Sequence, residues 1–295
     1  MNASGCYSST IQQLEELDRT PSCGAIVSKS CTLLAQDGNE HPRLYIGENS
    51  HINTCTNTCT NTCINSMGLP NLGHKYYSNI TTNKLYIQSV YPKNIDELDE
   101  LFTTKTNIIE VNMSCPNVVT SYKFNNYELY LDKINQIKKD KIIGIKLPPL
   151  FDLEEYNIMS NLLLKYNISF ITCTNTIPNC LVVDYKKEET VIRPNNGLGG
   201  MSFKPVSLSN VYNFHRILGD KIDIIGCGGI MTGLDVFEYI LCGAKCVQLG
   251  SCLLKKEGSE SFGRIEKELY NIMDVKGYNN VDDFRGRVRV CRAML

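Results

Sequence analysis

Short apolar segments alternate with amphipathic segments along almost the whole chain. Near-continuous apolar runs rich in Ile and Val are typical of parallel strands that are covered on both faces. Eight such runs are predicted as strands, at residues 1–5, 24–29, 84–90, 108–112, 142–147, 170–175, 222–226 and 246–250. Helical periodicity marks the segments between most of them, most clearly at residues 10–19, 95–103, 126–138, 153–165, 206–218 and 233–241.

This alternation predicts an α/β protein, specifically a (β/α)8 TIM barrel formed by a single domain over residues 1–295. Asp152 is placed to cap the helix at 153–165, and Ser207 or Ser209 the helix at 206–218. An open doubly wound sheet is the alternative, because periodicity alone cannot show that a sheet closes. Two insertions are expected after strand ends: an irregular segment after the second strand, and a β-hairpin formed by 181–185 and 189–193.

Polar residues and glycines follow most of the predicted strands. In a barrel these positions share the carboxyl-terminal face, where active sites are built. They are Lys29, Asn112, Lys146, Asn175 with Thr176, Cys227 with Gly228 and Gly229, and Gly250 with Ser251. Glycine turns after the seventh and eighth strands are typical of a phosphate site, although tight turns alone would also use glycine.

A phosphate near those turns and lysines at the second and fifth strands favour a flavin mononucleotide (FMN) across the barrel mouth. The segment from Glu110 to Asn117 adds a hydroxyl, a thiol and two carboxamides. The carboxamides of Asn65, Asn112, Asn117 and Asn175 would then surround a flat anionic substrate. Cys115 would supply a base, although a lone Cys-Pro turn is more often without function.

Composition excludes several other classes of protein. The 295 residues carry 30 basic and 31 acidic side chains, so a nucleic-acid partner and a basic membrane-binding face are not expected. No apolar run approaches the roughly 20 residues that span a bilayer, and no signal peptide is evident. We therefore expect an intracellular, cytoplasmic protein whose 14 cysteines are reduced.

A four-residue Thr-Cys-Thr-Asn repeat occupies residues 53–63. Its three cysteines, Cys55, Cys59 and Cys63, could share one helical face and bind a metal. No histidine cluster accompanies them, and Thr and Asn are poor helix formers. A loop expansion is therefore the preferred interpretation, and no metal site is predicted.

Four motifs stand out at or near the predicted strand ends: Asn65-Ser-Met-Gly-Leu-Pro-Asn71, Asn112-Met-Ser-Cys-Pro-Asn117, Gly144-Ile-Lys-Leu-Pro-Pro149 and Ile225-Gly-Cys-Gly-Gly-Ile230. Together they resemble the soluble dihydroorotate dehydrogenases, most closely the cytosolic class that uses fumarate. The similarity extends from Met1 to about Val290. It implies FMN-dependent oxidation of dihydroorotate to orotate in pyrimidine biosynthesis, with fumarate reduced to succinate, in a homodimer.

The resemblance also implies residue roles. Cys115 would be the base for the C5 proton of dihydroorotate, with Lys146 and Ser114 completing the catalytic set. The implied substrate-binding residues are Asn65, Met67, Gly68, Leu69, Asn112, Asn117, Asn175 and Thr176, the last in place of the usual Ser. The implied cofactor-binding residues are Ala3, Ser4, Lys29, Asn112, Lys146, Gly200, Cys227, Gly228, Gly229, Gly250 and Ser251.

The sequence also departs from the family pattern. The family's usual segment before the first strand is missing ahead of Met1, and the loop after Asn117 lacks the family's Pro-Gly-Lys-Pro. Two alternatives therefore stay open: an NAD-linked relative that needs an iron–sulfur partner chain, and a catalytically decayed homologue retained for binding.

Overall fold

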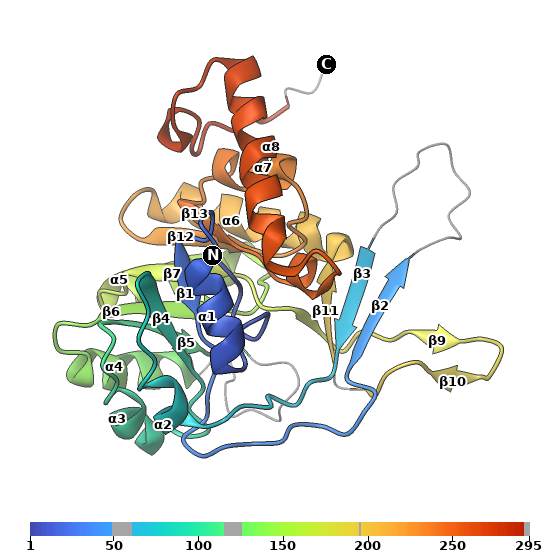
Figure 1. The fold of residues 1–295 in the computed structure, drawn as a ribbon. Coiled ribbons are helices and arrows are strands. Elements are labelled where there is room, and N and C mark those ends of the chain that lie inside the picture. The colour runs from blue at the N-terminus through green and yellow to red at the C-terminus, as the bar shows by residue number, and fades with distance from the viewer. Residues whose placement is uncertain (49–60, 115–125, 195, 292–295) are drawn as a thin grey trace.

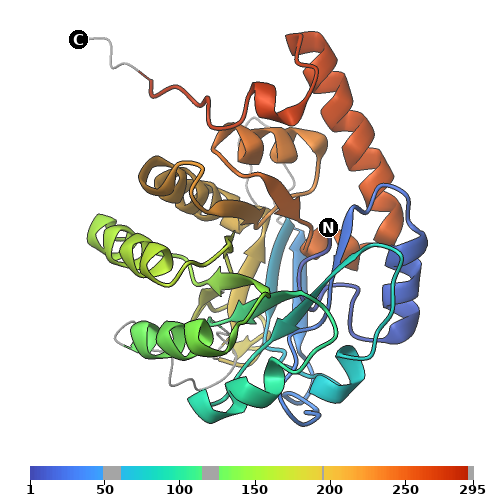
Figure 2. The same cartoon turned by 90° about the vertical axis from the view of Figure 1, so that its left-hand side faces the viewer.

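A curled sheet of seven parallel strands, covered on its outer face by helices, forms the body of the molecule (Figures 1 and 2). The computed structural model describes residues 1–48, 61–114, 126–194 and 196–291. In sheet order the strands are β1 (Ala25–Val27), β4 (Leu85–Val90), β5 (Ile108–Asn112), β6 (Ile142–Leu147), β7 (Phe170–Cys173), β12 (Asp223–Cys227) and β13 (Cys246–Gln248). The predicted α/β barrel architecture is confirmed.

Asn2 links the two edges of this sheet. Its backbone forms a parallel bridge with Leu249, next to β13. On the other side its side-chain amide acts like a peptide group toward β1: Nδ2 donates to the Val27 carbonyl at 2.7 Å, and Oδ1 accepts from the Val27 amide at 2.9 Å. The prediction of a strand over residues 1–5 was therefore wrong in form, because one backbone bridge and one side chain make the connection.

The helices lie outside the sheet, and most of them occupy the predicted ranges (Figure 2). The α-helices are α1 (Ile11–Arg19), α2 (His74–Tyr77), α3 (Leu98–Leu101), α4 (Tyr127–Ile137), α5 (Leu153–Lys165), α6 (Lys204–Leu218), α7 (Gly233–Leu241) and α8 (Ser261–Lys276). The short 3-10 helices are η1 (Ile95–Glu97), η3 (Met201–Phe203), η4 (Ser251–Leu254), η5 (Gly258–Glu260) and η6 (Val281–Asp283).

Two predicted helices differ in detail from the observed ones. The segment 95–103 forms η1 followed by the single turn of α3, so its regular helix is shorter than predicted. Asp152 caps α5 as predicted, accepting from the Glu154 amide at 2.7 Å. In contrast, α6 begins at Lys204, and the hydroxyl of Ser207 is buried against the Cys227 carbonyl at 2.7 Å instead of capping the helix.

The period-two alternation of the strands stacks distinct layers inside the barrel. The lowest layer is apolar and consists of Val27, Ile87, Phe170 and Ile225. Gly144 belongs to this level, because a Cβ there would lie 2.0 Å from the Phe170 ring. Two residues further along the strands the inward positions become polar: Ser89, Glu110, Thr172 and Gln248, all 0% exposed. A polar layer is unusual in a barrel core, which branched apolar residues normally fill.

A four-stranded antiparallel sheet, which the sequence did not reveal, is built from the two insertions. Its order is β2 (Leu44–Glu48), β3 (Asn61–Asn65), β11 (Gly197–Gly200) and β8 (Ile177–Pro178). The predicted hairpin is confirmed in shorter form as β9 (Val183–Asp184) and β10 (Glu189–Thr190), which project from the barrel (Figure 1). The end of the Thr-Cys-Thr-Asn repeat enters β3, whereas Cys55 and Cys59 lie outside the described residues.

Candidate active site

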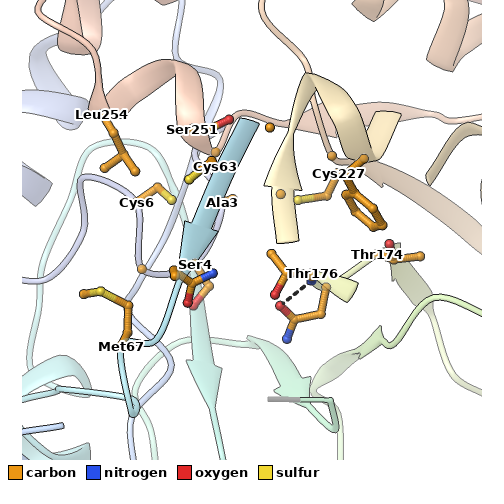
Figure 3. A pocket seen from close by; sticks show the side chains of 18 of the residues that line it. Ala3, Ser4, Cys6, Cys63, Met67, Thr174, Thr176, Cys227, Ser251 and Leu254 are labelled. Atoms are coloured by element: carbon orange, nitrogen blue, oxygen red, sulfur yellow. Dashed lines mark hydrogen bonds between the residues drawn. The ribbon is translucent and has the colours of Figure 1, made fainter. Parts of the chain in front are cut away.

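A cavity of about 1140 Å³, including its open mouth, lies at the carboxyl ends of the barrel strands, beside β3 and β11 (Figure 3). Most of the predicted site residues line it. They are Ala3, Ser4, Lys29, Asn65, Met67, Leu69, Asn112, Lys146, Asn175, Thr176, Gly200, Cys227, Gly228, Gly229, Gly250 and Ser251. Residues more than 240 positions apart in the chain thus share one wall, as expected when strand ends converge.

Four predicted site residues are placed differently or are not described. Gly68 lies behind the wall, where a Cβ would meet Oδ1 of Asn39 at 2.4 Å. Ser114 is not among the lining residues, and its hydroxyl donates to the Lys146 carbonyl at 3.1 Å. Cys115 and Asn117 lie outside the described residues, so their roles stay predictions.

Lys146 is the buried cation of the cavity floor. Its Nζ lies 3.3 Å from Oε1 of Gln248 and 3.9 Å from Sγ of Cys227. Nε2 of Gln248 in turn donates to Glu110 at 2.7 Å. Burial acts to lower the pKa of Lys146, but the nearby carboxylate of Glu110 acts to raise it, and the net shift of the pKa is upward. Lys146 is therefore an ammonium ion at neutral pH.

Hydroxyl groups connect the same polar layer to the cavity wall near the N-terminus. Oγ of Ser4 lies 2.8 Å from Oγ of Ser30, which lies 2.9 Å from Oγ of Ser89. Ser89 donates to Glu110 at 3.4 Å. Glu110, at 0% exposure, also accepts from Thr172 at 2.7 Å. Its carboxyl group thus receives hydrogen bonds from three side chains, as a buried polar group requires.

The carboxamides of Asn112 and Asn175 are held by each other and by the backbone. Nδ2 of Asn112 donates to Ser30, and its Oδ1 accepts from the Ser114 amide at 3.2 Å. Nδ2 of Asn175 donates to the Ser114 carbonyl at 2.9 Å and to Oδ1 of Asn112 at 3.3 Å. Oδ1 of Asn175 accepts from the Thr176 amide, the dashed contact in Figure 3. Both amides therefore present fixed orientations beside the cavity.

Lys29 contributes a second cation at the N-terminal side of the wall. It is buried, and its backbone amide donates to the Ser8 carbonyl. Gly5 leaves space for its ammonium group, because a Cβ at Gly5 would lie 2.6 Å from Nζ of Lys29. Gly5 also has a φ of +85°, which only glycine adopts without strain. Gly5 was not predicted as a site residue, yet it lines the cavity.

Backbone amides after β12 and β13 form another part of the cavity wall. Within the described ranges no protein acceptor lies within hydrogen-bonding distance of the amides of Gly229, Gly250 and Ser251. Gly229 has a φ of +66°, and a Cβ there would lie 2.6 Å from the Gly200 carbonyl oxygen. These amides are open donors where two strands end, an arrangement suited to an anionic group.

Sequence comparison assigns the chain to a family. The family model described as dihydroorotate dehydrogenase matches residues 1–273. The chain belongs to the dihydroorotate dehydrogenase family. Dihydroorotate dehydrogenase (fumarate) of Saccharomyces cerevisiae is 38% identical over 311 residues, covering 98% of this chain and 93% of the relative. The Saccharomyces paradoxus enzyme of the same name is 40% identical, covering 97% and 93%.

A bacterial relative and a solved structure agree with this assignment. Putative dihydroorotate dehydrogenase A (fumarate) of Streptococcus agalactiae is 38% identical, covering 98% of this chain and 94% of the relative. The crystal structure of DHODH in complex with ferulenol from Eimeria tenella superposes with a TM-score of 0.76 at 18% identity. That match covers 97% of this chain and 84% of the other, and it supports the barrel fold alone.

Membership of the dihydroorotate dehydrogenase family implies a flavin cofactor, and the donors of this cavity fit one. Lys29 and Lys146 supply buried positive charge, and the open amides of Gly229, Gly250 and Ser251 supply anion-binding donors. A flavin nucleotide carries an electron-accepting ring at one end and a phosphate at the other. The presence of both buried cations and open amides in one cavity matches that chemistry.

Several dihydroorotate dehydrogenase cavity residues were missed from sequence, among them two thiols and several small or apolar groups. They are Gly5, Cys6, Ser30, Leu44, Cys63, Thr174, Gly199, Phe203 and Leu254. Figure 3 shows Cys6 and Cys63 on the wall opposite Cys227. Burial raises the pKa of Cys63 to about 12 and also raises the pKa of Cys6 and Cys227. These side chains are neutral thiols. Among the missed residues only Ser30, two positions after Ser28 at the end of β1, gave a sequence signal that could have found it.

Proposed function

We propose that this chain is a single FMN-binding domain that oxidises dihydroorotate to orotate in pyrimidine biosynthesis. The supporting observation is the Lys146 ammonium, held by Gln248 above the buried Glu110 and facing the same cavity as Asn112 and Asn175. A buried cation next to fixed carboxamides suits a flat ring that gains negative charge while a planar anion lies against it. The relatives named dihydroorotate dehydrogenase (fumarate) support the same reaction.

The cofactor would be FMN rather than a larger flavin. Gly228, Gly229, Gly250 and Ser251 would hold its phosphate, and Lys146 and Lys29 would face its ring. When bound, the flavin supplies a hydride acceptor. Lys146 would stabilise negative charge on the ring electrostatically, because burial strengthens that interaction relative to water. Ala3, Ser4 and Gly200 would line the sides of this cofactor.

Dihydroorotate would lie among the carboxamides of Asn65, Asn112, Asn117 and Asn175, with Met67, Leu69 and Thr176 completing the contact surface. Cys115 would remove the C5 proton as the hydride leaves C6. An ordinary thiol has a pKa of about 8.5, so this group needs local positive charge or hydrogen bonding to act as a base near neutrality. Ser114 would assist by positioning the loop through its hydrogen bond to the Lys146 carbonyl.

Replacing Cys115 by Ala tests the proposed base. We expect loss of dihydroorotate-dependent flavin reduction by about 10²–10⁴-fold, the usual contribution of a positioned acid or base, with flavin binding retained. Cys180→Ala is the matched control, because Cys180 lies at the inserted hairpin and does not line the cavity. Unchanged flavin reduction in Cys115→Ala would contradict the role of Cys115, and protein that binds no FMN would contradict the proposed function.

Fumarate is proposed as the electron acceptor, reacting at the same cavity after orotate leaves. Initial rates with fumarate, NAD or a quinone as sole acceptor distinguish this proposal from an NAD-linked relative. Ping-pong kinetics with fumarate are expected, and turnover that requires NAD and a partner chain would contradict it.

A cytoplasmic homodimer is the proposed state in the cell. Exposed apolar side chains support a second copy: Leu44 and Ile46 on β2, and Leu181, Val183 and Tyr185 at the hairpin. None of the helices in the described ranges is long and apolar enough to cross a bilayer. The resemblance to the fumarate-using class supports the proposed location. Light scattering of the purified protein and cell fractionation test the two statements.

A further inference from the structure

A second concave surface lies away from the active-site cavity, where α7 and α8 end. This groove of about 1010 Å³, open to solvent, is lined by Phe237 and Leu241 of α7, Lys276 and Tyr278 at the end of α8, and Arg287 and Arg289 of the following segment. Three of these six residues are cationic, and none is acidic. A concave surface lined by charges of one sign concentrates field lines and attracts counter-ions.

Backbone hydrogen bonds fix the two arginines. The Gly286 amide donates to the Ile240 carbonyl at 3.0 Å, and the Val288 amide donates to the Leu241 carbonyl at 3.1 Å. The Val288 bond satisfies the Leu241 carbonyl at the end of α7, and the Ile240 carbonyl also accepts from the Gly243 amide at 2.9 Å. Because alternate residues of the segment bond to α7, Arg287 and Arg289 are the positions left to face the groove.

The aromatic residues beside the groove form a rigid stack. The rings of Phe237 and Phe284 are stacked with centroids 4.5 Å apart, and the Tyr278 ring lies 5.1 Å from that of Phe284. Nζ of Lys276 lies 5.5 Å from the Phe237 centroid. Tyr278 is half-buried, and its ring lies at the groove wall. A flat ligand ring could therefore lie against Tyr278 while the cations contact its charged end.

Helix-end electrostatics explain only part of this positive charge. Each helix C-terminus carries roughly half a negative charge, so α7 and α8 together offset about one cation. Asp283 interacts electrostatically with Arg287 and offsets part of another. Among the described residues, no ion pair within 4.0 Å involves Lys276, Arg287 or Arg289. A surplus of positive charge remains, with donors suited to phosphate.

We propose that this groove binds a nucleoside polyphosphate, with its phosphates on Lys276, Arg287 and Arg289 and its base on Tyr278. The site is separate from the cavity that would hold FMN: α7 begins at Gly233, just after the Gly229 turn of that cavity, and the groove lies at the other end of the helix. The proposal does not depend on which reaction the cavity catalyses.

Isothermal titration of FMN-saturated protein with UTP, ATP and inorganic tripolyphosphate tests the proposal. We expect one nucleotide per chain, at least tenfold weaker binding in Arg287→Ala/Arg289→Ala, and weaker UTP and ATP binding but unchanged tripolyphosphate binding in Tyr278→Ala. Lys267→Ala is the matched control, because Lys267 is exposed on α8 outside the groove and should bind normally.

Three results would overturn the proposal. They are no binding of any probe at millimolar concentration, nucleotide binding that survives the double arginine substitution, and tripolyphosphate binding as tightly as UTP. Equal binding of tripolyphosphate and UTP would mean that the groove binds polyanions through their charge alone, without a contact to the nucleotide base. Thermal unfolding of each variant checks that the fold is intact, so that a loss of binding can be attributed to the groove itself.

Discussion

Replacing Asn2 by Ala should weaken the whole barrel, although Asn2 belongs to no regular strand. The backbone groups of Val27 that face Asn2 are on the side of β1 away from β4, because the Ser28 amide already bonds to the Ile87 carbonyl of β4. Removing the Asn2 amide leaves the N–H and C=O of Val27 without partners in a buried location.

The cost follows from those two groups. Each buried backbone group that loses its partner costs about 1–3 kcal/mol, so we expect Asn2→Ala to lower the free energy of unfolding by about 2–6 kcal/mol. A protein of ordinary stability has only about 5–15 kcal/mol in total. The lost Nδ2 bonds to the Ala3 and Cys6 carbonyls at 3.3 and 3.2 Å act in the same direction. They also position the segment that carries Ala3 and Ser4 into the cavity.

Urea unfolding of the flavin-loaded protein measures this effect, with the midpoint and slope both fitted. Asn271→Ala is the control, because Asn271 is exposed on α8 and Ala favours a helix. Asn2→Asp should be at least as destabilising as Asn2→Ala near neutral pH, because a carboxylate oxygen would replace the donor 2.7 Å from the Val27 carbonyl oxygen in a buried location. An Asn2→Ala midpoint equal to that of Asn271→Ala would refute the closing role of the side chain.

Three further substitutions or modifications test the site. Gly5→Ala should weaken flavin binding, because the added Cβ would lie 2.6 Å from Nζ of Lys29. Gly277→Ala is the control: Gly277 has a φ of +74° but open space around it, so this substitution introduces only the backbone strain of about 1–2 kcal/mol. Glu110→Gln removes a carboxylate that raises the pKa of Lys146. In the folded parent protein the pKa of Lys146 is raised above its unfolded value of about 10.4. Protonated Lys146 therefore contributes its full stabilisation below about pH 10.4, and this contribution is lost as the pH rises through the pKa of the folded state. That loss should move to lower pH in Glu110→Gln, as measured by urea midpoints across alkaline pH, and an unchanged profile would contradict the coupling. The pKa of Cys63 is raised to about 12, so its thiol should resist iodoacetamide in the folded protein and react fully once the protein is unfolded. Mass spectrometry measures the labelling, and rapid labelling of Cys63 in folded protein at neutral pH would contradict this prediction.

The sequence predicted the parallel strands well because burial on both faces leaves a continuous apolar signal. It also located the strand ends where Lys29, Asn112 and Lys146 meet. It failed at residues 1–5, where one side chain replaces a strand, because hydropathy cannot show that Asn2 acts as a peptide group. It also failed at β3 and β11, whose Asn and Gly residues carry little strand propensity.

The cavity residues that were missed share a physical reason. Cys6, Cys63 and Phe203 look like ordinary small or apolar core residues, and only the antiparallel sheet and the N-terminal segment bring them to the cavity wall. Cys115 was identified through its motif, and its geometry lies outside the described residues. Sequence therefore revealed the residues at strand ends more readily than those that insertions bring to the cavity.

The pairing of β2 with β3 has a consequence for how this chain can vary in length. The register from Leu44 opposite Asn65 to Glu48 opposite Asn61 anchors both ends of the segment between them. Pairing of β3 with β11 anchors Asn65 a second time. Gain or loss of whole Thr-Cys-Thr-Asn units between residues 48 and 61 would therefore leave Asn65 in place. Alleles that differ in repeat number should encode equally active proteins, and the same position should accept an inserted epitope or fluorophore tag.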